Sequence, residues 1–178
     1  IIGVGSLLVV DQEFHDMLNK SFNSSDIKRI NLVITEFGNA ISALTICGII
    51  SIKNPKTGYL GANAVIYSGL ACQVLKAVFG RARPWVSKGP YSFIGPGFSD
   101  NYNSMPSGHS ATVFSLATVL AKQYPEYKHA VYILAVLVAT SRVCAHAHWP
   151  SDILAGAAIG VWSANHVMGN SKLFEIRW

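Results

Sequence analysis

Three short segments of this 178-residue chain carry side chains that can bind and transform an anionic group. In the first, Lys76 precedes Arg83 by seven residues, a spacing that places both side chains on one face of a helix. Two cations on one face can converge on a single anion. The alternative is a lysine that snorkels at a helix end beside an unrelated loop arginine. This pair alone is compatible with both interpretations.

The second segment is M-P-S-G-H-S at 105–110, directly before an apolar run. Its turn predicts a helix N-terminus at Ser107 and Gly108, where free backbone amides and the helix dipole favour phosphate. His109 stands beside these amides and can act as a general acid or base. A simple turn capped by a serine explains such a sequence equally often.

The third segment begins at Arg142, which ends an apolar run, where an uncompensated cation is costly. Further along, His148 precedes Asp152 by four residues, and Pro150 predicts that a helix starts between them. The carboxylate then lies one turn into the helix and can bond the imidazole. Such a bond fixes the tautomer and leaves the other ring nitrogen free as a nucleophile or base.

Together the three segments supply two histidines, an orienting aspartate, three cations and a helix N-terminus. This set suits phosphoryl transfer, in which cations neutralise the phosphate, one histidine attacks and another protonates the leaving oxygen. The pair His146 and His148 suggests a metal site. Two ligands without a third, placed among arginines that repel a cation, argue against it.

The composition indicates what kind of element positions these residues. Hydrophobic residues make up 51% of the chain and charged residues only 13%, about half the share of a typical soluble domain. This argues against a disordered chain, a coiled coil or an ordinary cytosolic domain. The net charge of +5 comes from scattered basic residues without interleaved aromatics. It therefore favours a phosphorylated substrate or anionic lipid over nucleic acid.

Five apolar runs separate the polar segments and predict an all-α, membrane-embedded helical bundle. In the last run, Gly156 and Gly160 stand four residues apart, a spacing that permits close helix contact. The apolar residues 1–10 are too few to cross a bilayer, which takes about 20, so we expect about six spans with the first incomplete. The runs cover 30–52, 59–79, 110–121, 130–145 and 153–168.

If the runs alternate in direction, the turns 53–58 and 122–129 and the C-terminal tail share one side of the membrane. The positive-inside rule predicts that this side is cytoplasmic. All three reactive segments then lie at the outer membrane–water interface, facing the periplasm or exterior of the inner membrane. The cytoplasmic side would hold Lys53, Lys56, Lys122, Lys128, Lys172 and Arg177 against Glu126 and Glu175.

The segments K-A-V-F-G-R-A-R-P (76–84), P-S-G-H (106–109) and S-R-V-C-A-H-A-H-W-P-S-D (141–152) resemble the three-part signature of the type-2 phosphatidic acid phosphatase superfamily. That superfamily includes lipid phosphate phosphatases, bacterial class A acid phosphatases and vanadium haloperoxidases. The signature covers 76–152 within a single domain, 1–178, and the apolar runs extend the resemblance to roughly 30–168.

The resemblance implies a role for each signature residue. His148 would attack phosphorus and form a phosphohistidine, and Asp152 would hold its tautomer. His109 would protonate the leaving group and then activate water. We expect Arg81 close beside the phosphate pocket, and no metal or cofactor, because the side chains already neutralise the phosphate. The phosphate-binding positions would be Lys76, Arg83, Ser107, Gly108 and Arg142.

The resulting hypothesis is a membrane phosphatase that hydrolyses a lipid phosphate or pyrophosphate, in contact with membrane lipids and without an obligate protein partner. A soluble acid phosphatase or haloperoxidase is the alternative. The shortness of the last three runs favours it, whereas the low charge and the long run at 30–52 oppose it. A non-enzymatic lipid-binding or transport module is a third hypothesis, which the intact signature disfavours.

Overall fold

A computed structural model describes residues 10–22 and 24–170, and the predicted all-α class is confirmed. In this part of the chain the extended pairing is limited to a single bridge between Arg81 and Phe93. The expected incomplete span at 1–10 and the basic tail fall almost wholly outside the described residues. The helices are α2 (Asp11–Ser21), α3 (Ser25–Glu36), α4 (Ala40–Lys53), α5 (Pro55–Phe79), α6 (Gly108–Gln123), α7 (Lys128–Cys144) and α8 (Pro150–Gly169), with short 3₁₀ turns η1 (Pro84–Val86), η2 (Asp100–Tyr102) and η3 (Pro125–Tyr127).

The apolar run expected as one element at 30–52 is instead divided between α3 and α4, which meet at an angle of 57°. Asn39 begins the second helix, because its side chain accepts a hydrogen bond of 2.9 Å from the amide of Ile41. Gly38 lies at the bend, where a Cβ atom would come within 2.7 Å of Val138 and 2.9 Å of His109. The bend itself therefore packs against α6 and α7.

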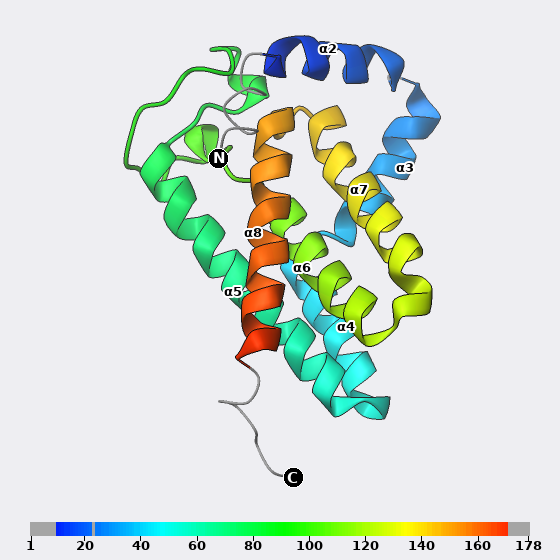
Figure 1. Cartoon of the computed structure of the whole chain (residues 1–178). Coiled ribbons are helices and arrows are strands. Elements are labelled where there is room, and N and C mark those ends of the chain that lie inside the picture. Colours follow the sequence, from blue (N-terminus) through cyan, green and yellow to red (C-terminus); the bar gives the residue numbers. More distant parts are fainter. Residues whose placement is uncertain (1–9, 23, 171–178) are drawn as a thin grey trace.

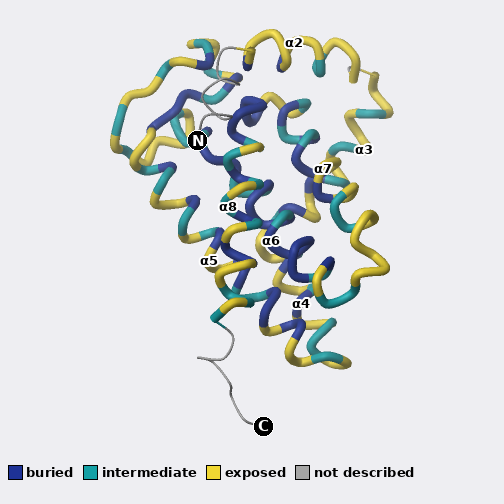
Figure 2. Tube along the Cα trace, in the orientation of Figure 1, coloured by how far each residue is buried: buried dark blue, intermediate teal, exposed yellow. Residues whose placement is uncertain are grey.

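Helix α6 occupies the centre of the bundle, between α5, α7 and α8 (Figure 1), and most of its residues are buried (Figure 2). Two of the glycines of α8, Gly156 and Gly160, face the backbone of α6. A Cβ atom at Gly156 would lie 2.3 Å from the carbonyl oxygen of Ser107, and one at Gly160 would lie 2.4 Å from that of Ala111. The close helix contact predicted from their spacing is confirmed, and it holds the start of α8 against the start of α6.

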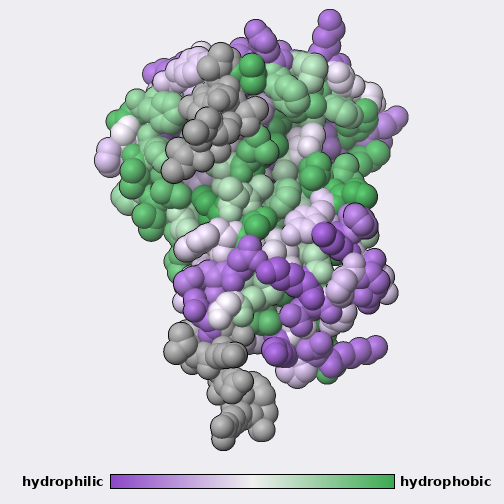
Figure 3. Space-filling model, in the orientation of Figure 1, coloured by the Kyte–Doolittle hydropathy of each residue, from purple (hydrophilic) through white to green (hydrophobic). Residues whose placement is uncertain are grey.

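The bundle has an apolar girdle between two polar ends (Figure 3). One end carries the α4–α5 and α6–α7 turns; the other carries α2, the loop after α5 and the α7–α8 connection (Figure 1). By length and composition, α5 qualifies as a membrane-crossing helix and the bent pair α3–α4 as a second. Helices α6 and α7, with 16 and 17 residues, extend about 25 Å, against roughly 30 Å of bilayer core. The number of spans therefore stays a prediction.

Candidate active site

The three predicted segments meet at one end of the bundle. Helix α5 ends with Lys76 in its last turn, and α7 ends with Arg142 in its last turn. His109 lies in the first turn of α6, close enough to Arg142, His148, Lys76 and Arg83 for their charges to act on its ring. Residues as far apart in the sequence as Lys76 and His148 thus surround one small space, as the predicted phosphoryl transfer requires.

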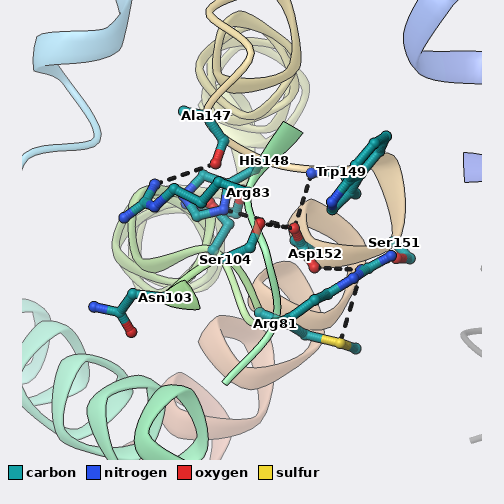
Figure 4. A network of polar contacts seen from close by, with 12 residues as sticks. Arg81, Arg83, Asn103, Ser104, Ala147, His148, Trp149, Ser151 and Asp152 are labelled. Carbon is teal, nitrogen blue, oxygen red and sulfur yellow. Dashed lines mark hydrogen bonds and ion pairs between the residues drawn. The ribbon is translucent and has the colours of Figure 1, made fainter. Parts of the chain in front are cut away.

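His148 occupies the connection between α7 and α8, buried beside Asp152 (Figure 4). Its Nδ1 atom lies 3.7 Å from the carboxylate oxygen Oδ2 and has no hydrogen-bond partner. The expected orienting pair is therefore in place, but at a distance too long for a hydrogen bond, as is common before substrate binds. Burial lowers the pKa of His148 to about 4, so the ring is neutral at physiological pH.

The carboxylate of Asp152 is held by other donors. Ser104 donates to Oδ2 at 2.5 Å, and the amide of Trp149 donates to the same oxygen at 2.8 Å. The second bond caps α8, in the manner of an acidic residue in a first helical turn. As predicted, the helix starts at Pro150 after Trp149. These bonds fix the carboxylate independently of the histidine, so the ring alone has to move to close the gap.

Arg81 holds the other oxygen of Asp152 and so lies close beside the proposed phosphate pocket, behind this carboxylate. Its guanidinium is completely buried and donates to Asp152 at 2.6 Å, to Ser151 at 2.7 Å and to Asp11 at 2.6 Å. Figure 4 shows it on the side of Asp152 opposite His148. Arg81 therefore supports the carboxylate from behind and is not available to phosphate.

Asp11 completes this buried network from α2. Its carboxylate also accepts hydrogen bonds from the amide of Ser151 at 2.8 Å and from its hydroxyl at 2.6 Å. Two buried carboxylates flank the single guanidinium of Arg81, so the group carries one net negative charge. If His148 is the nucleophile, this charge stabilises the positive charge that develops on its ring. The sequence offered only one signal for Asp11, a carboxylate directly after an apolar run.

The cations Lys76 and Arg83 are held mostly by neutral oxygen atoms. Lys76, which is buried, donates to the carbonyl of Asn103. Arg83 donates to the carbonyl before His148 at 3.1 Å and, at 3.0 Å, to Asp100, whose side chain is 77% exposed. Among the described residues, Lys76 forms no ion pair and the carboxylate that pairs with Arg83 is solvent-exposed, an arrangement that favours an anionic ligand.

Arg142 approaches from α7. It donates a hydrogen bond of 2.8 Å to the hydroxyl of Thr35 on α3, while its buried Nε atom has no partner. Thr35 was not identified from the sequence, because its partner lies 107 positions away. The unpartnered donor gives this guanidinium capacity for a phosphate oxygen.

The start of α6 supplies backbone donors. Ser107 caps the helix, its hydroxyl accepting from the amide of Ser110 at 3.4 Å, and its own amide donates to the carbonyl of Asp152 at 2.9 Å. The amides of Gly108 and His109 have no acceptor within the helix, as at any helix start. The predicted helix N-terminus is therefore present beside the histidines.

Across 10–22 and 24–170, no three histidine, cysteine, aspartate or glutamate side chains are grouped so that they can hold a metal ion. His146, considered as a metal ligand with His148, instead has its Nδ1 atom 3.2 Å from the Nε2 atom of His15. The chemistry available to the described residues is thus that of two histidines, one carboxylate and three cations.

Comparison with known proteins agrees with this geometry. Residues 58–172 match the family model of the PAP2 superfamily. A lipid A 1-phosphatase of Rhizobium etli is 33% identical over 159 residues, which cover 76% of this chain and 68% of that protein. An undecaprenyl-diphosphatase of Sulfolobus acidocaldarius is 30% identical, over 84% of this chain and 74% of that protein. The crystal structure of Aquifex aeolicus LpxE superimposes with a TM-score of 0.77 at 19% identity, over 90% of this chain and 95% of that one.

Proposed function

This chain belongs to the PAP2 superfamily, and we propose from this premise that it is a metal-independent membrane phosphatase that hydrolyses a lipid phosphate or pyrophosphate. The observation that carries the proposal is the convergence of Lys76, Arg83 and Arg142 around His109 and His148. Relatives that are named for hydrolysis of lipid A phosphate and undecaprenyl diphosphate support a lipid substrate.

In the first step, the three cations and the amides at the start of α6 bind the non-bridging oxygens of the phosphate. The Nε2 atom of His148 attacks phosphorus as the bond to the leaving oxygen breaks, and His109 donates a proton to that oxygen. The ring of His148 becomes cationic. Its Nδ1–H then donates to Asp152, whose charge stabilises the phosphohistidine.

In the second step, His109 is a base. It removes a proton from a water molecule whose oxygen attacks the phosphohistidine, and the bond from Nε2 to phosphorus breaks. Inorganic phosphate leaves, and His148 returns to its neutral form. The low pKa of His148 favours this return, because burial disfavours the charged ring.

We propose further that the helices from α3 to α8 cross the membrane, with the active site at the outer interface. Exposed aliphatic side chains on α3, α4, α5 and α7 support contact with lipid. The soluble alternative would place these side chains in water. The positive-inside rule supports a cytoplasmic position for the opposite end, where the two turns carry Lys53, Lys56, Lys122 and Lys128 against Glu126.

The test is release of phosphate from phosphatidic acid, phosphatidylglycerol phosphate and a prenyl diphosphate, in detergent with EDTA present. We expect turnover that the chelator does not reduce. His148→Ala should abolish it, whereas His129→Ala, an exposed histidine at the opposite end of α7, should not. An acid-labile phosphoprotein trapped with wild type and missing from His148→Ala would identify the nucleophile. Inactivity on all three lipids would contradict the proposal.

A further inference from the structure

A cavity of about 640 Å³ opens beside the proposed phosphate site, between the end of α2, the helix α3 and the end of α7. Its volume lies in the range of pockets that hold small organic ligands, and it exceeds what a single ion needs. Most of the residues that line the cavity take no part in the two proposed reaction steps. Its basic members are Lys20, Lys28, Arg142 and His146.

The charge of this cavity is one-sided. None of its lining residues carries a carboxylate. Within the described part of the chain, Lys20 and Lys28 form no ion pair and no side-chain hydrogen bond. Lys28 lies near enough to His146 for its charge to act on that ring. Lys20, Lys28 and Arg142 are the cations of the cavity, whereas burial lowers the pKa of His146. The nearby carboxylates, Asp16 and Glu36, act on His146 and Arg142 from outside the lining, so the two lysines leave the cavity favourable to an anionic ligand.

The position of the cavity indicates which anion. Arg142 lines it and also belongs to the phosphate site, so the two spaces share one cation. On α3, Leu32 lines both the cavity and a mainly apolar groove of about 590 Å³ along the bend between α3 and α4. In the groove, Val33 and Ile41 are 66% and 75% exposed. The cationic cavity therefore adjoins both the phosphate site, through Arg142, and the apolar groove, through Leu32.

We propose that the cavity binds a second anionic group of the substrate, situated between the phosphate under attack and the hydrocarbon chain, with Lys20 and Lys28 as its main ligands. A lipid diphosphate has this order of groups, as does a lipid whose terminal phosphate follows a phosphodiester. A simple lipid monophosphate has no such second anion. The inference rests on the proposed function, since it names the substrate class that the same site prefers.

The test compares farnesyl diphosphate with farnesyl phosphate, which share one hydrocarbon chain, in micelles of a neutral detergent. The double variant Lys20→Gln/Lys28→Gln should lower kcat/KM for the diphosphate about 10- to 100-fold, mainly through KM, because charge-assisted contacts are lost. Its kcat/KM for the monophosphate should stay within about twofold of wild type. The matched control, Lys53→Gln/Lys56→Gln, removes two exposed lysines at the opposite end and should change neither substrate.

An equal loss on both substrates would overturn the inference, because the lysines would then serve the reacting phosphate or the fold. No loss on either would also overturn it, as would a loss seen only when an anionic lipid is added to the micelles.

Calorimetric binding of farnesyl diphosphate to His148→Ala separates this inference from the proposed function, since it needs no turnover. Adding Lys20→Gln/Lys28→Gln to that background should weaken binding at least tenfold. Unchanged binding would overturn the cavity proposal, whatever the activity of the wild type.

Discussion

Replacing Asp11 by asparagine tests whether the buried network behind Asp152 supports both the fold and the chemistry. Both oxygens of the Asp11 carboxylate accept hydrogen bonds, from Ser151 and from Arg81. An asparagine has the same shape but must turn its NH₂ group toward one of these donors. One buried donor then loses its partner, and the charge opposite the guanidinium disappears.

The expected cost follows from these contacts. Loss of a charge-assisted hydrogen bond and an unsatisfied buried donor together destabilise a protein by about 3 kcal/mol. For a chain of this length that corresponds to a decrease in Tm of roughly 6–12 °C. The control Asp26→Asn alters an exposed carboxylate in the first turn of α3 and should shift Tm by no more than about 2 °C.

The same substitution changes the net charge behind His148 from −1 to zero. We expect kcat to decrease about tenfold, equivalent to about 1.4 kcal/mol less stabilisation of the cationic ring. Thermal unfolding in detergent micelles and phosphate release well below Tm provide the two measurements. A Tm equal to that of Asp26→Asn would refute the network. A lowered Tm with unchanged kcat would refute its electrostatic role and leave Asp11 purely structural.

Two further predictions concern packing and pH. Gly156→Ala should lower both Tm and kcat, because its Cβ atom would meet the carbonyl oxygen of Ser107 at 2.3 Å. Gly169→Ala should lower neither, because nothing lies within 4 Å of that position. Thermal unfolding and phosphate release compare the two variants. The depressed pKa of His148 means that the unfolded chain binds its proton more readily. Stability should therefore decrease as pH falls from 6.5 to about 4, by up to about 3 kcal/mol, and His148→Ala should lack this part of the decrease in a pH series of unfolding curves.

The sequence predicts those parts of the site that depend on local rules. Pro150 and Ser107 mark the helix starts that place His148, Asp152 and His109, because proline and a capping serine act within one turn. The spacing of Gly156 and Gly160 likewise predicts the contact that joins α8 to another helix.

Local rules do not reveal which residues far apart in the sequence form hydrogen bonds and ion pairs with each other. Arg81 and Asp11 lie 70 positions apart, and Arg142 and Thr35 lie 107 apart, so no periodicity connects them. The division of the run at 30–52 was missed for a related reason. Asn39 in an apolar run is either a polar residue inside a helix or the cap of a new one, and only the packing of Gly38 against His109 and Val138 decides between them.

The contacts of α2 explain why a polar helix at the edge of the bundle matters for a site built on α5 to α8. Asp11 bonds Ser151, His15 contacts His146, and Asn19 donates to the carbonyl of Val143 at 3.3 Å. All three partners flank His148 along the chain. Helix α2 therefore supports the segment that carries His148, the proposed nucleophile.

The end of the same helix supplies Lys20 to the cationic cavity. Helix α2 therefore joins the proposed ligand of the second anion to the contacts that hold the segment around His148.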